Sequence, residues 1–332
     1  MSSPPRLTPM LTSPLVLEPV LVPKPWGGHR LHALGRHDDA TTPTGESWDV
    51  ADLPTDATSV DDPVSRVAGG PADGRSLGDL IAEDRTGLLG DASPVDDRFP
   101  LLVKTLDAAE MLSVQVHPPR SLDALRYKTE SWVVLDAEPD AVNLLGVADG
   151  VTLDDVRAAI GSEDLLDLLR AVPARPGEVI HLPAGMIHAL GAGVLVAEVQ
   201  TPSDVTHRLW DWPDQRDGGR ELHVEAGFAS IEAGWRHNLD VAARPAEDGT
   251  LVRTDAYRLN RVTLAADEVL PASLEPGTAR TCIVLDGSIR WEDPQLGDRR
   301  RTRTECVLLP AASAEPLRAG EDGATVLVAV PG

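Results

Sequence analysis

Cysteine is scarce in this sequence, and so are basic residues and long apolar runs. Cys282 and Cys306 are the only cysteines in 332 residues, which argues against a disulfide framework and against a cysteine-based metal site. No apolar run approaches the ~18 residues needed to span a bilayer, and the N-terminus lacks the basic region of a signal peptide. We therefore expect a cytoplasmic protein with no membrane partner.

The charge balance is strongly acidic, with 30 Lys and Arg against 53 Asp and Glu and a formal net charge of −23. Such a surface repels nucleic acid and anionic membranes, so neither is an expected partner. An anionic substrate would still need a local positive pocket. The length is sufficient for two domains with their own cores.

Four side chains with donor atoms suited to one divalent metal occur in two separated segments. They are Gln115, His117 and Glu130 in the first segment and His188 in the second. Gln115 and His117 alternate with valines, and a strand places alternate residues on one face. The pair would then project together from a strand, although an exposed polar face fits the same spacing.

The second segment, EVIHLPAGMIHALGAG, indicates a strand, a Pro/Gly turn and a further Gly-rich turn before the apolar run that begins at Val194. His188 would stand just past the first turn, between two strands. That position suits a metal ligand at the rim of a β-barrel, and it also suits a simple turn residue.

Six phrases of the sequence resemble one enzyme family, the type I mannose-6-phosphate isomerases in their short form. They are LLVKTLDAAEMLSVQVHP, YKTESWVVLDAEP, LPAGMIHALGAGVLVAEVQ and TPSDVTHRLWDW, preceded by PKPWGG and GESWDV. The match spans roughly residues 15 to 213 in the right order. The family usually has Gly where this chain has Tyr127, before the Lys of the Lys-x-Glu motif.

The resemblance implies a metal-dependent cupin enzyme that interconverts mannose 6-phosphate and fructose 6-phosphate through a cis-enediol. It implies one zinc ion per chain, bound by the four candidate ligands named above, Gln115, His117, Glu130 and His188. It also places Arg208 in the active site, as the residue usually assigned as catalytic, together with Glu198. The proton-transfer base could be Glu198 or a metal-bound water.

Four further residues are candidates for substrate binding. Lys104 is either a solvated strand residue or a buried cation that a sugar phosphate would partner, and Lys128 would share a face with Glu130. Glu46 is either a buried acid near the metal or a charged strand edge. Trp26 either lies near the active site or packs against the end of the barrel. Without the resemblance, Arg208 would be assigned to the surface of a strand.

The predicted fold is mainly β, with two cupin-like jelly-roll or β-sandwich domains and a small helical insertion. We expect a flexible arm at 1–14, a metal-binding catalytic domain at 15–235, and a metal-free cupin-like domain at 236–332. Thr152 and Asp155 resemble a capping box, which places the helical insertion at about 151–172. A short helix is expected near Ser76 to Glu83.

Two other functional classes fit parts of the pattern. A sugar-phosphate-binding cupin regulator without catalysis is one, although no basic patch accompanies it. An iron-dependent cupin oxygenase is the other, although Gln115 stands where a His-x-His motif would have its first His. The sequence leaves the oligomeric state open between monomer and homodimer.

Overall fold

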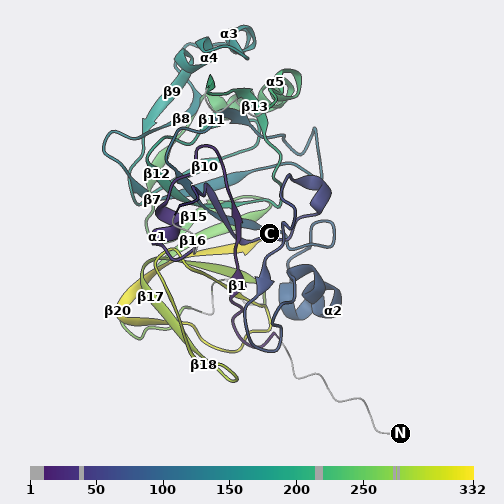
Figure 1. Cartoon of the computed structure of the whole chain (residues 1–332), viewed down its shortest axis with the longest axis vertical. Helices are drawn as coiled ribbons and strands as arrows, with labels where there is room; N and C mark the ends of the chain where they lie inside the picture. Colours follow the sequence, from purple (N-terminus) through teal and green to yellow (C-terminus); the bar gives the residue numbers. More distant parts are fainter. Residues whose placement is uncertain (1–10, 37–40, 214–219, 272–273, 275–276) are drawn as a thin grey trace. The chain divides into compact units, whose positions relative to one another are not determined.

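Two compact units make up the chain. The computed structural model describes residues 11–36, 41–213, 220–271, 274 and 277–332. Unit 1 comprises Met1–Pro19, Val64–Pro100 and Glu247–Gly332, and unit 2 comprises Val20–Pro63 and Leu101–Ala246. Each unit is built around antiparallel strands, as Figure 1 shows.

Unit 2 contains a seven-stranded antiparallel sheet. Its strands, in spatial order, are β14 (Ala243–Pro245), β10 (Glu178–Leu182), β7 (Glu130–Ala137), β12 (Val194–Gln200), β5 (Leu102–Ala108), β3 (Glu46–Val50) and β2 (Val20–Val22). β7, β12, β5 and β3 are buried along most of their length. Their side chains therefore belong to the interior on both faces.

A second sheet of unit 2 has five strands, in the order β13 (His207–Trp210), β6 (Val114–Val116), β11 (His188–Ala189), β8 (Val142–Val147) and β9 (Leu169–Pro173). One core cluster joins Trp132, Val134 and Val196 of the first sheet to Leu145 of the second. Alternating residues of two sheets that share a core in this way define a β-sandwich. The predicted cupin-like fold class is confirmed.

The helices of unit 2 among its described residues are short. They are α1 (Arg30–Ala33), η1 (Thr55–Ala57), α3 (Leu153–Ala159), α4 (Asp164–Asp167), α5 (Val224–Ala233) and η3 (Trp235–Asn238). The apolar residues of α3, α4 and α5, among them Val156, Leu165 and Ile231, share a core cluster with Val114 and Val116 of β6. α3, α4 and α5 therefore cover the face of the five-stranded sheet that is turned away from the other sheet.

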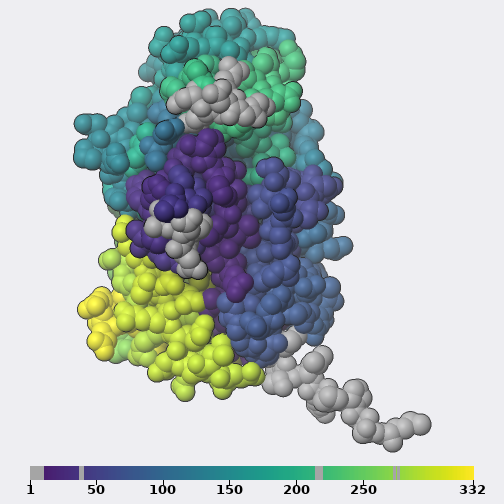
Figure 2. Space-filling view, in the orientation of Figure 1, coloured from purple at the N-terminus to yellow at the C-terminus, as the bar shows by residue number. Residues whose placement is uncertain are grey.

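Unit 1 contains a six-stranded sheet in the order β15 (Gly249–Arg253), β16 (Tyr257–Leu264), β20 (Arg318–Pro331), β17 (Arg280–Asp293) and β18 (Gly297–Thr302), with β19 (Cys306–Leu309) paired to β17. β1 (Leu17–Glu18) pairs with β4 (Arg66–Val67). The remaining helix, α2 (Leu77–Leu89), also belongs to this unit. Residues 64–100, drawn in blue, lie beside the yellow-green C-terminal strands of the unit (Figure 2).

The units divide the chain differently from the predicted boundary between residues 235 and 236. Residues 64–100 pack with the C-terminal strands, because backbone hydrogen bonds join Ala279 to Leu89 (3.2 Å) and Asp91 to Gly277 (3.1 Å). Such long-range pairing leaves no periodic trace in the sequence. The predicted arm at 1–14 falls largely outside the described residues, but Leu11 within it is buried.

Most local predictions agree with the structure. The helical insertion at 151–172 is present, and Thr152 and Asp155 form the predicted capping box, although its last residues belong to β9. The helix expected at Ser76 to Glu83 begins as predicted and continues to Leu89, past a break at Asp84. α5 has apolar residues at helical spacing, including Phe228 and Ile231, but it was not predicted.

Candidate active site

Polar side chains gather at one end of the inner face of the seven-stranded sheet. Glu198 on β12 lies directly opposite Lys104 on β5 and Trp132 on β7. Two residues further along the same face, Val196 and Leu106 belong to the apolar core. Alternation along each strand keeps both groups on one face, so this face changes from apolar to charged along its length.

The five-stranded sheet supplies side chains from the opposite side of the core. In its ladder, Gln115 on β6 is paired both with His188 on β11 and with Arg208 on β13. Val114 and Val116 point to the other face, where they pack with the helices. The predicted alternation of Gln115 and His117 with two valines is therefore confirmed as the local geometry.

The Pro183–Met186 turn brings His188 to its place. Gly185 has φ +85°, and a Cβ atom on it would lie 2.6 Å from Cα of Gly234. Only glycine allows the two backbones this approach. Asn238 locks the turn, since its side chain accepts from the amide of Ile187 (2.7 Å) and donates to the carbonyl of Gly185 (2.9 Å).

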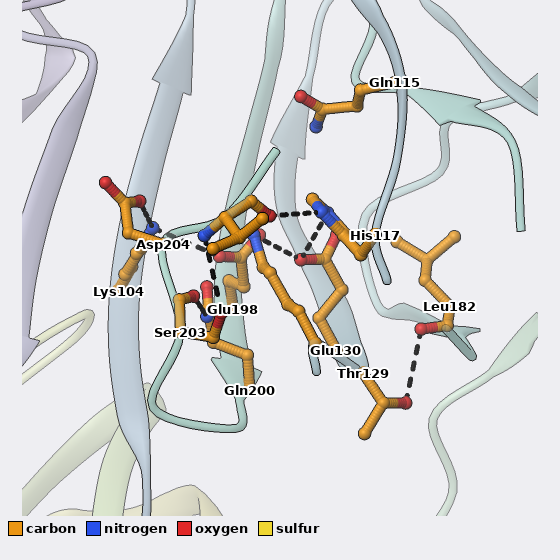
Figure 3. Close-up of polar contacts among 12 residues, drawn as sticks. Lys104, Gln115, His117, Thr129, Glu130, Leu182, Glu198, Gln200, Ser203 and Asp204 are labelled. Atoms are coloured by element: carbon orange, nitrogen blue, oxygen red, sulfur yellow. Dashed lines mark hydrogen bonds and ion pairs between the residues drawn. The ribbon is translucent and has the colours of Figure 1, made fainter. Parts of the chain in front are cut away.

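His117, Glu130 and His188 converge on one point. Their ligand atoms all lie within 4.8 Å of one another, and all three side chains are buried. Nε2 of each imidazole lies 3.3 Å from a different oxygen of Glu130, and Figure 3 shows the His117 ring pointing toward that carboxylate. The side-chain nitrogen of Gln115 lies 3.3 Å from Nε2 of His188.

The hydrogen bonds of the two imidazoles fix their tautomers. Nδ1 of His117 donates to the carbonyl of Val205, and Nδ1 of His188 donates to the carbonyl of Met186, both at 2.9 Å. In the neutral ring the opposite nitrogen then carries a lone pair. Burial lowers the pKa of His117 to about 3, and the charge of nearby Lys128 adds to the shift, so this ring is neutral at pH 7.

The cluster has a donor set suited to a divalent cation, and it contains a buried donor atom that such a cation would satisfy. Nε2 of His117 and Nε2 of His188 each direct a lone pair toward Glu130, and Nε2 of His117 is buried without a hydrogen-bond partner in the described part of the chain. Burial alone would raise the pKa of Glu130, but the charge of Lys128, 2.8 Å away, holds it well below its ordinary value. A metal ion fits this site.

A second charged group surrounds Lys104. Its Nζ lies 3.0 Å from Glu46, 3.5 Å from Asp204 and 3.8 Å from Glu198. Burial alone would lower the pKa of this ammonium, but the three carboxylates raise it, so Lys104 stays charged. Lys104 is therefore a buried cation and not a solvated strand residue, and carboxylates already provide its partners.

Glu198 differs from the other carboxylates of the group. Burial, together with the nearby charge of Glu130, raises its pKa to about 7, although Lys128 and Lys104 act in the opposite direction. One of its oxygens accepts a hydrogen bond from the indole N–H of Trp132 (2.7 Å), and the other has no hydrogen-bond partner among the described residues. A carboxylate of this kind can exchange a proton near neutral pH.

Arg208 is partly buried at the edge of the five-stranded sheet. Its Nε donates to the hydroxyl of Ser113 (3.3 Å), and one Nη donates to the carbonyl of Glu221 (3.2 Å). Asp211 lies 3.7 Å from Nε. With 17% of the side chain exposed, Arg208 is not the solvated surface residue that its strand position alone would suggest.

Lys104, Glu198 and Arg208 line a cavity of about 390 Å³ within unit 2. His117, Glu130 and His188 are not among its lining residues. The predicted metal ligand Gln115 lines this cavity. So do all of the predicted substrate-binding and catalytic residues, which are Trp26, Glu46, Lys104, Lys128, Glu198 and Arg208. Five lysine and arginine side chains and three carboxylates are among the lining residues. A cavity with an excess of cations inside a chain of charge −23 is suited to an anion.

Sequence reasoning missed several residues of the cavity. Asp204, which contacts Lys104, stands in a quoted motif but gave no local signal of its role. Arg220 and His223 also line the cavity, yet they follow a polar segment without periodicity. His223 accepts a hydrogen bond from the amide of Arg208 on β13, and Arg220 contacts Asp211, and local patterns do not encode either contact.

The fold and the site together define a metal-site enzyme of the cupin type, with a buried His/Glu cluster beside a charged cavity. Residues 15–140 match the model of the family described as phosphomannose isomerase type I, catalytic domain. Relatives more than 30% identical, each covered over more than two thirds of its length, show that the chain belongs to the type I mannose-6-phosphate isomerase family.

Two bacterial relatives illustrate the similarity. A mannose-6-phosphate isomerase of Streptococcus mutans is 34% identical over 231 residues, which covers 68% of this chain and 69% of the relative. The mannose-6-phosphate isomerase ManA of Bacillus subtilis is 35% identical over 231 residues, which covers 67% and 69%. These relatives favour the isomerase over a regulator or an oxygenase.

Solved structures agree with the fold. The crystal structure of the mannose 6-phosphate isomerase from Bacillus subtilis superposes with a TM-score of 0.77 at 25% identity, and the match covers 96% of this chain and 99% of that one. A mannose 6-phosphate isomerase bound with zinc and yttrium gives a TM-score of 0.68 at 17% identity, with 96% and 99% covered. At that identity the second likeness supports the fold alone.

Among the described residues, no helix is long and apolar enough to cross a membrane.

Proposed function

We propose that this chain interconverts mannose 6-phosphate and fructose 6-phosphate through a cis-enediol, with a zinc ion held by Gln115, His117, Glu130 and His188. The observation that carries the proposal is the position of Glu198. Its carboxylate, with a pKa near 7, lines the same cavity as Gln115 and Arg208. A base, a metal ligand and a guanidinium around one cavity match the demands of an aldose-ketose isomerisation.

Zinc is proposed over other metals because two imidazoles and a carboxylate suit it. A mannose 6-phosphate isomerase of the same fold has been crystallised with zinc. When bound, the ion supplies positive charge beside the sugar oxygens. The neutral amide of Gln115 leaves most of that charge in place.

Glu198 is the proposed base, in preference to a metal-bound water. In the aldose-to-ketose direction it removes the proton from C2 of the open-chain sugar. The electron pair of that C–H bond forms the C1–C2 double bond, and the carbonyl oxygen on C1 takes up a proton, which gives the enediol. Delivery of a proton to C1 and loss of the O2 proton complete the ketose, so no redox partner is needed. Trp132 keeps the carboxylate in place through its 2.7 Å hydrogen bond.

Arg208 is proposed to stabilise the negative charge that develops on the enediolate oxygens. Its planar guanidinium can offer two parallel N–H donors. Lys104 and Lys128 are proposed to donate to substrate oxygens, because both line the cavity. Glu46 orients Lys104 from 3.0 Å, and Trp26 supplies an apolar wall.

The remaining proposals concern the molecule and its setting. We propose that the catalytic residues all lie within residues 15–235 and that residues 236–332 supply no metal ligand. All of the proposed ligands precede residue 213, and the His/Glu cluster lies wholly in unit 2. The acidic composition and a phosphorylated metabolite as substrate support action in the cytoplasm. We propose a monomer or a homodimer.

A coupled assay tests the function directly. Purified protein is supplied with mannose 6-phosphate, and fructose 6-phosphate is measured before chelation, after chelation and after zinc is restored. We expect activity, loss and recovery in that order. Metal content is measured in His117→Ala and His188→Ala, with the exposed His29→Ala as the matched control. Wild-type metal content in the first two variants would refute the ligand assignment.

A further inference from the structure

The loop between β12 and β13, residues 201–206, contacts both the His/Glu cluster and the group around Lys104. The carbonyl of Val205 accepts the hydrogen bond from Nδ1 of His117 (2.9 Å). On the preceding residue, the carboxylate of Asp204 lies 3.5 Å from Nζ of Lys104. The backbone position of the 201–206 loop therefore affects a proposed metal ligand and a carboxylate of the cavity together.

The two histidines of the cluster differ in where their acceptors lie in the chain. Nδ1 of His188 donates to the carbonyl of Met186, two residues away in the same turn. Nδ1 of His117 donates to a carbonyl 88 residues away. The first contact is therefore set by local geometry. The second depends on what holds the 201–206 loop in place.

Ser203 fastens this loop to the segment that leads into β7. Its side chain is buried. The hydroxyl donates to the carbonyl of Arg126 (2.7 Å) and accepts from the amide of Val205 (3.4 Å). One side chain thus joins the residue that orients His117 to the segment that carries Glu130.

Gln200 supports the same loop from the sheet. Its side chain is fully buried at the end of β12, directly opposite Glu130 in the ladder with β7. The side-chain nitrogen donates to the carbonyls of Thr201 (2.9 Å) and Ser203 (2.5 Å), and Figure 3 shows Gln200 beside Ser203 and Glu198. The sheet therefore fixes the path of the chain into the 201–206 loop.

We propose that Ser203 and Gln200 are positioning residues for the metal ligand His117, and that they set the affinity for zinc without being ligands themselves. This inference rests on the proposed function, which supplies the zinc site. Both residues act through the carbonyl of Val205. A carbonyl held at Nδ1 keeps the proton on that nitrogen and leaves the lone pair of Nε2 for the ion.

The test compares Ser203→Ala, Ser203→Thr and Gln200→Met with the wild type and with Ser162→Ala. Ser162 is a matched control because its hydroxyl also donates to a backbone carbonyl of unit 2, that of Ala159 (3.1 Å), but lies in the helical insertion. The Kd for zinc is measured by competition with a chelator. Two-bond ¹⁵N–¹H correlation spectra of the chelated protein report the tautomer of His117, and His117→Ala assigns its signals. Thermal unfolding confirms that each chelated variant is folded.

For Ser203→Ala and Gln200→Met we expect the Kd for zinc to rise by roughly 10- to 100-fold. The signal of the Nδ1–H tautomer of His117 should weaken in both. Ser203→Thr keeps the hydroxyl and should restore near wild-type affinity, and Ser162→Ala should bind zinc like the wild type. At saturating zinc, kcat should recover most of what Ser203→Ala loses at limiting zinc.

The two positioning variants change the loop from different sides, so one folded variant is sufficient for the test. Wild-type zinc affinity and an unchanged tautomer in folded Ser203→Ala or Gln200→Met would overturn the inference for that residue. A wild type that binds no zinc would overturn both this inference and the proposed function. A wild type that binds zinc through the loop but does not isomerise mannose 6-phosphate would overturn the function alone.

Discussion

Individual side chains in this site owe their properties to their neighbours more than to their type. Glu46 and Glu198 are both buried glutamates beside Lys104. The charges of Lys104 and Lys24 overcome the effect of burial on Glu46 and lower its pKa far below the ordinary value. For Glu198, burial and the charge of Glu130 prevail and raise the pKa to about 7. One of these carboxylates is therefore a fixed anion, and the other is suited to proton transfer.

The pH dependence of the reaction follows from the state of Glu198. A base must be ionised, so kcat/KM should fall as the pH decreases through the pKa of this group. With a divalent cation bound nearby, the extra positive charge favours the carboxylate, and the midpoint should lie at or below about 7. The measurement is a pH profile of kcat/KM for the metal-loaded enzyme. Glu198→Gln should lower kcat by about 10²–10⁴, and unchanged kcat in that variant would assign the base elsewhere.

Arg208 is expected to act on the chemical step. Arg208→Ala should keep the metal and the fold while kcat falls on the order of 10²–10³, because a preorganised donor toward the enediolate is lost. Arg208→Lys should lose less, since charge returns without the planar fork. Steady-state kinetics and metal analysis provide the measurement. Near wild-type kcat with only KM raised would make Arg208 a binding residue and leave its proposed role to another group.

At the scale of elements, the helical insertion serves as scaffold. The α3 capping box joins the Thr152 hydroxyl to the Asp155 amide (3.2 Å), and the Asp155 carboxylate to the Thr152 amide (2.9 Å). The apolar side of the helix, including Val156, packs on the five-stranded sheet. No residue of the insertion lines the cavity. Its contribution is therefore to cover the apolar face behind β6.

Thr152→Ala tests this assignment. Loss of the N-cap should lower the Tm by roughly 2–4 °C, which corresponds to a loss of about 1 kcal/mol in a domain of this size. Because the helix packs behind the sheet, kcat and KM should stay at wild-type values. Thermal unfolding and steady-state kinetics check the two halves of the expectation. A fall in kcat without a fall in Tm would show that the insertion takes part in the site.

At the scale of the whole molecule, the metal should be part of the stability of the fold. The cluster joins β7 of one sheet to β11 of the other, through Glu130 and His188. Without a cation, buried lone pairs face a buried carboxylate. A ligand that binds only the folded state stabilises it by about 2.7 kcal/mol at a free concentration of 100 Kd. Chelation should therefore lower the Tm, and returning zinc should restore it. Equal unfolding curves for chelated and zinc-loaded protein would contradict a structural role for the ion.

Local patterns in the sequence determined several features by themselves. The alternation of Gln115 and His117 with valines placed two polar side chains on one face, because a strand has a period of two. The Thr152 and Asp155 pair located α3, because capping is a contact between residues three apart. Together with the motif order, these signals were enough for the β class and for the set of candidate ligands.

Tertiary structure alone decided the partners of these side chains. Lys104 contacts Glu46, Asp204 and Glu198 from three separate segments, and Arg220 contacts Asp211. The division into units also depends on backbone hydrogen bonds between residues far apart in the sequence, such as the one from Ala279 to Leu89. The physical reason is that charge and pKa depend on distance and burial in space, whereas sequence periodicity records only which face of its own element a residue occupies.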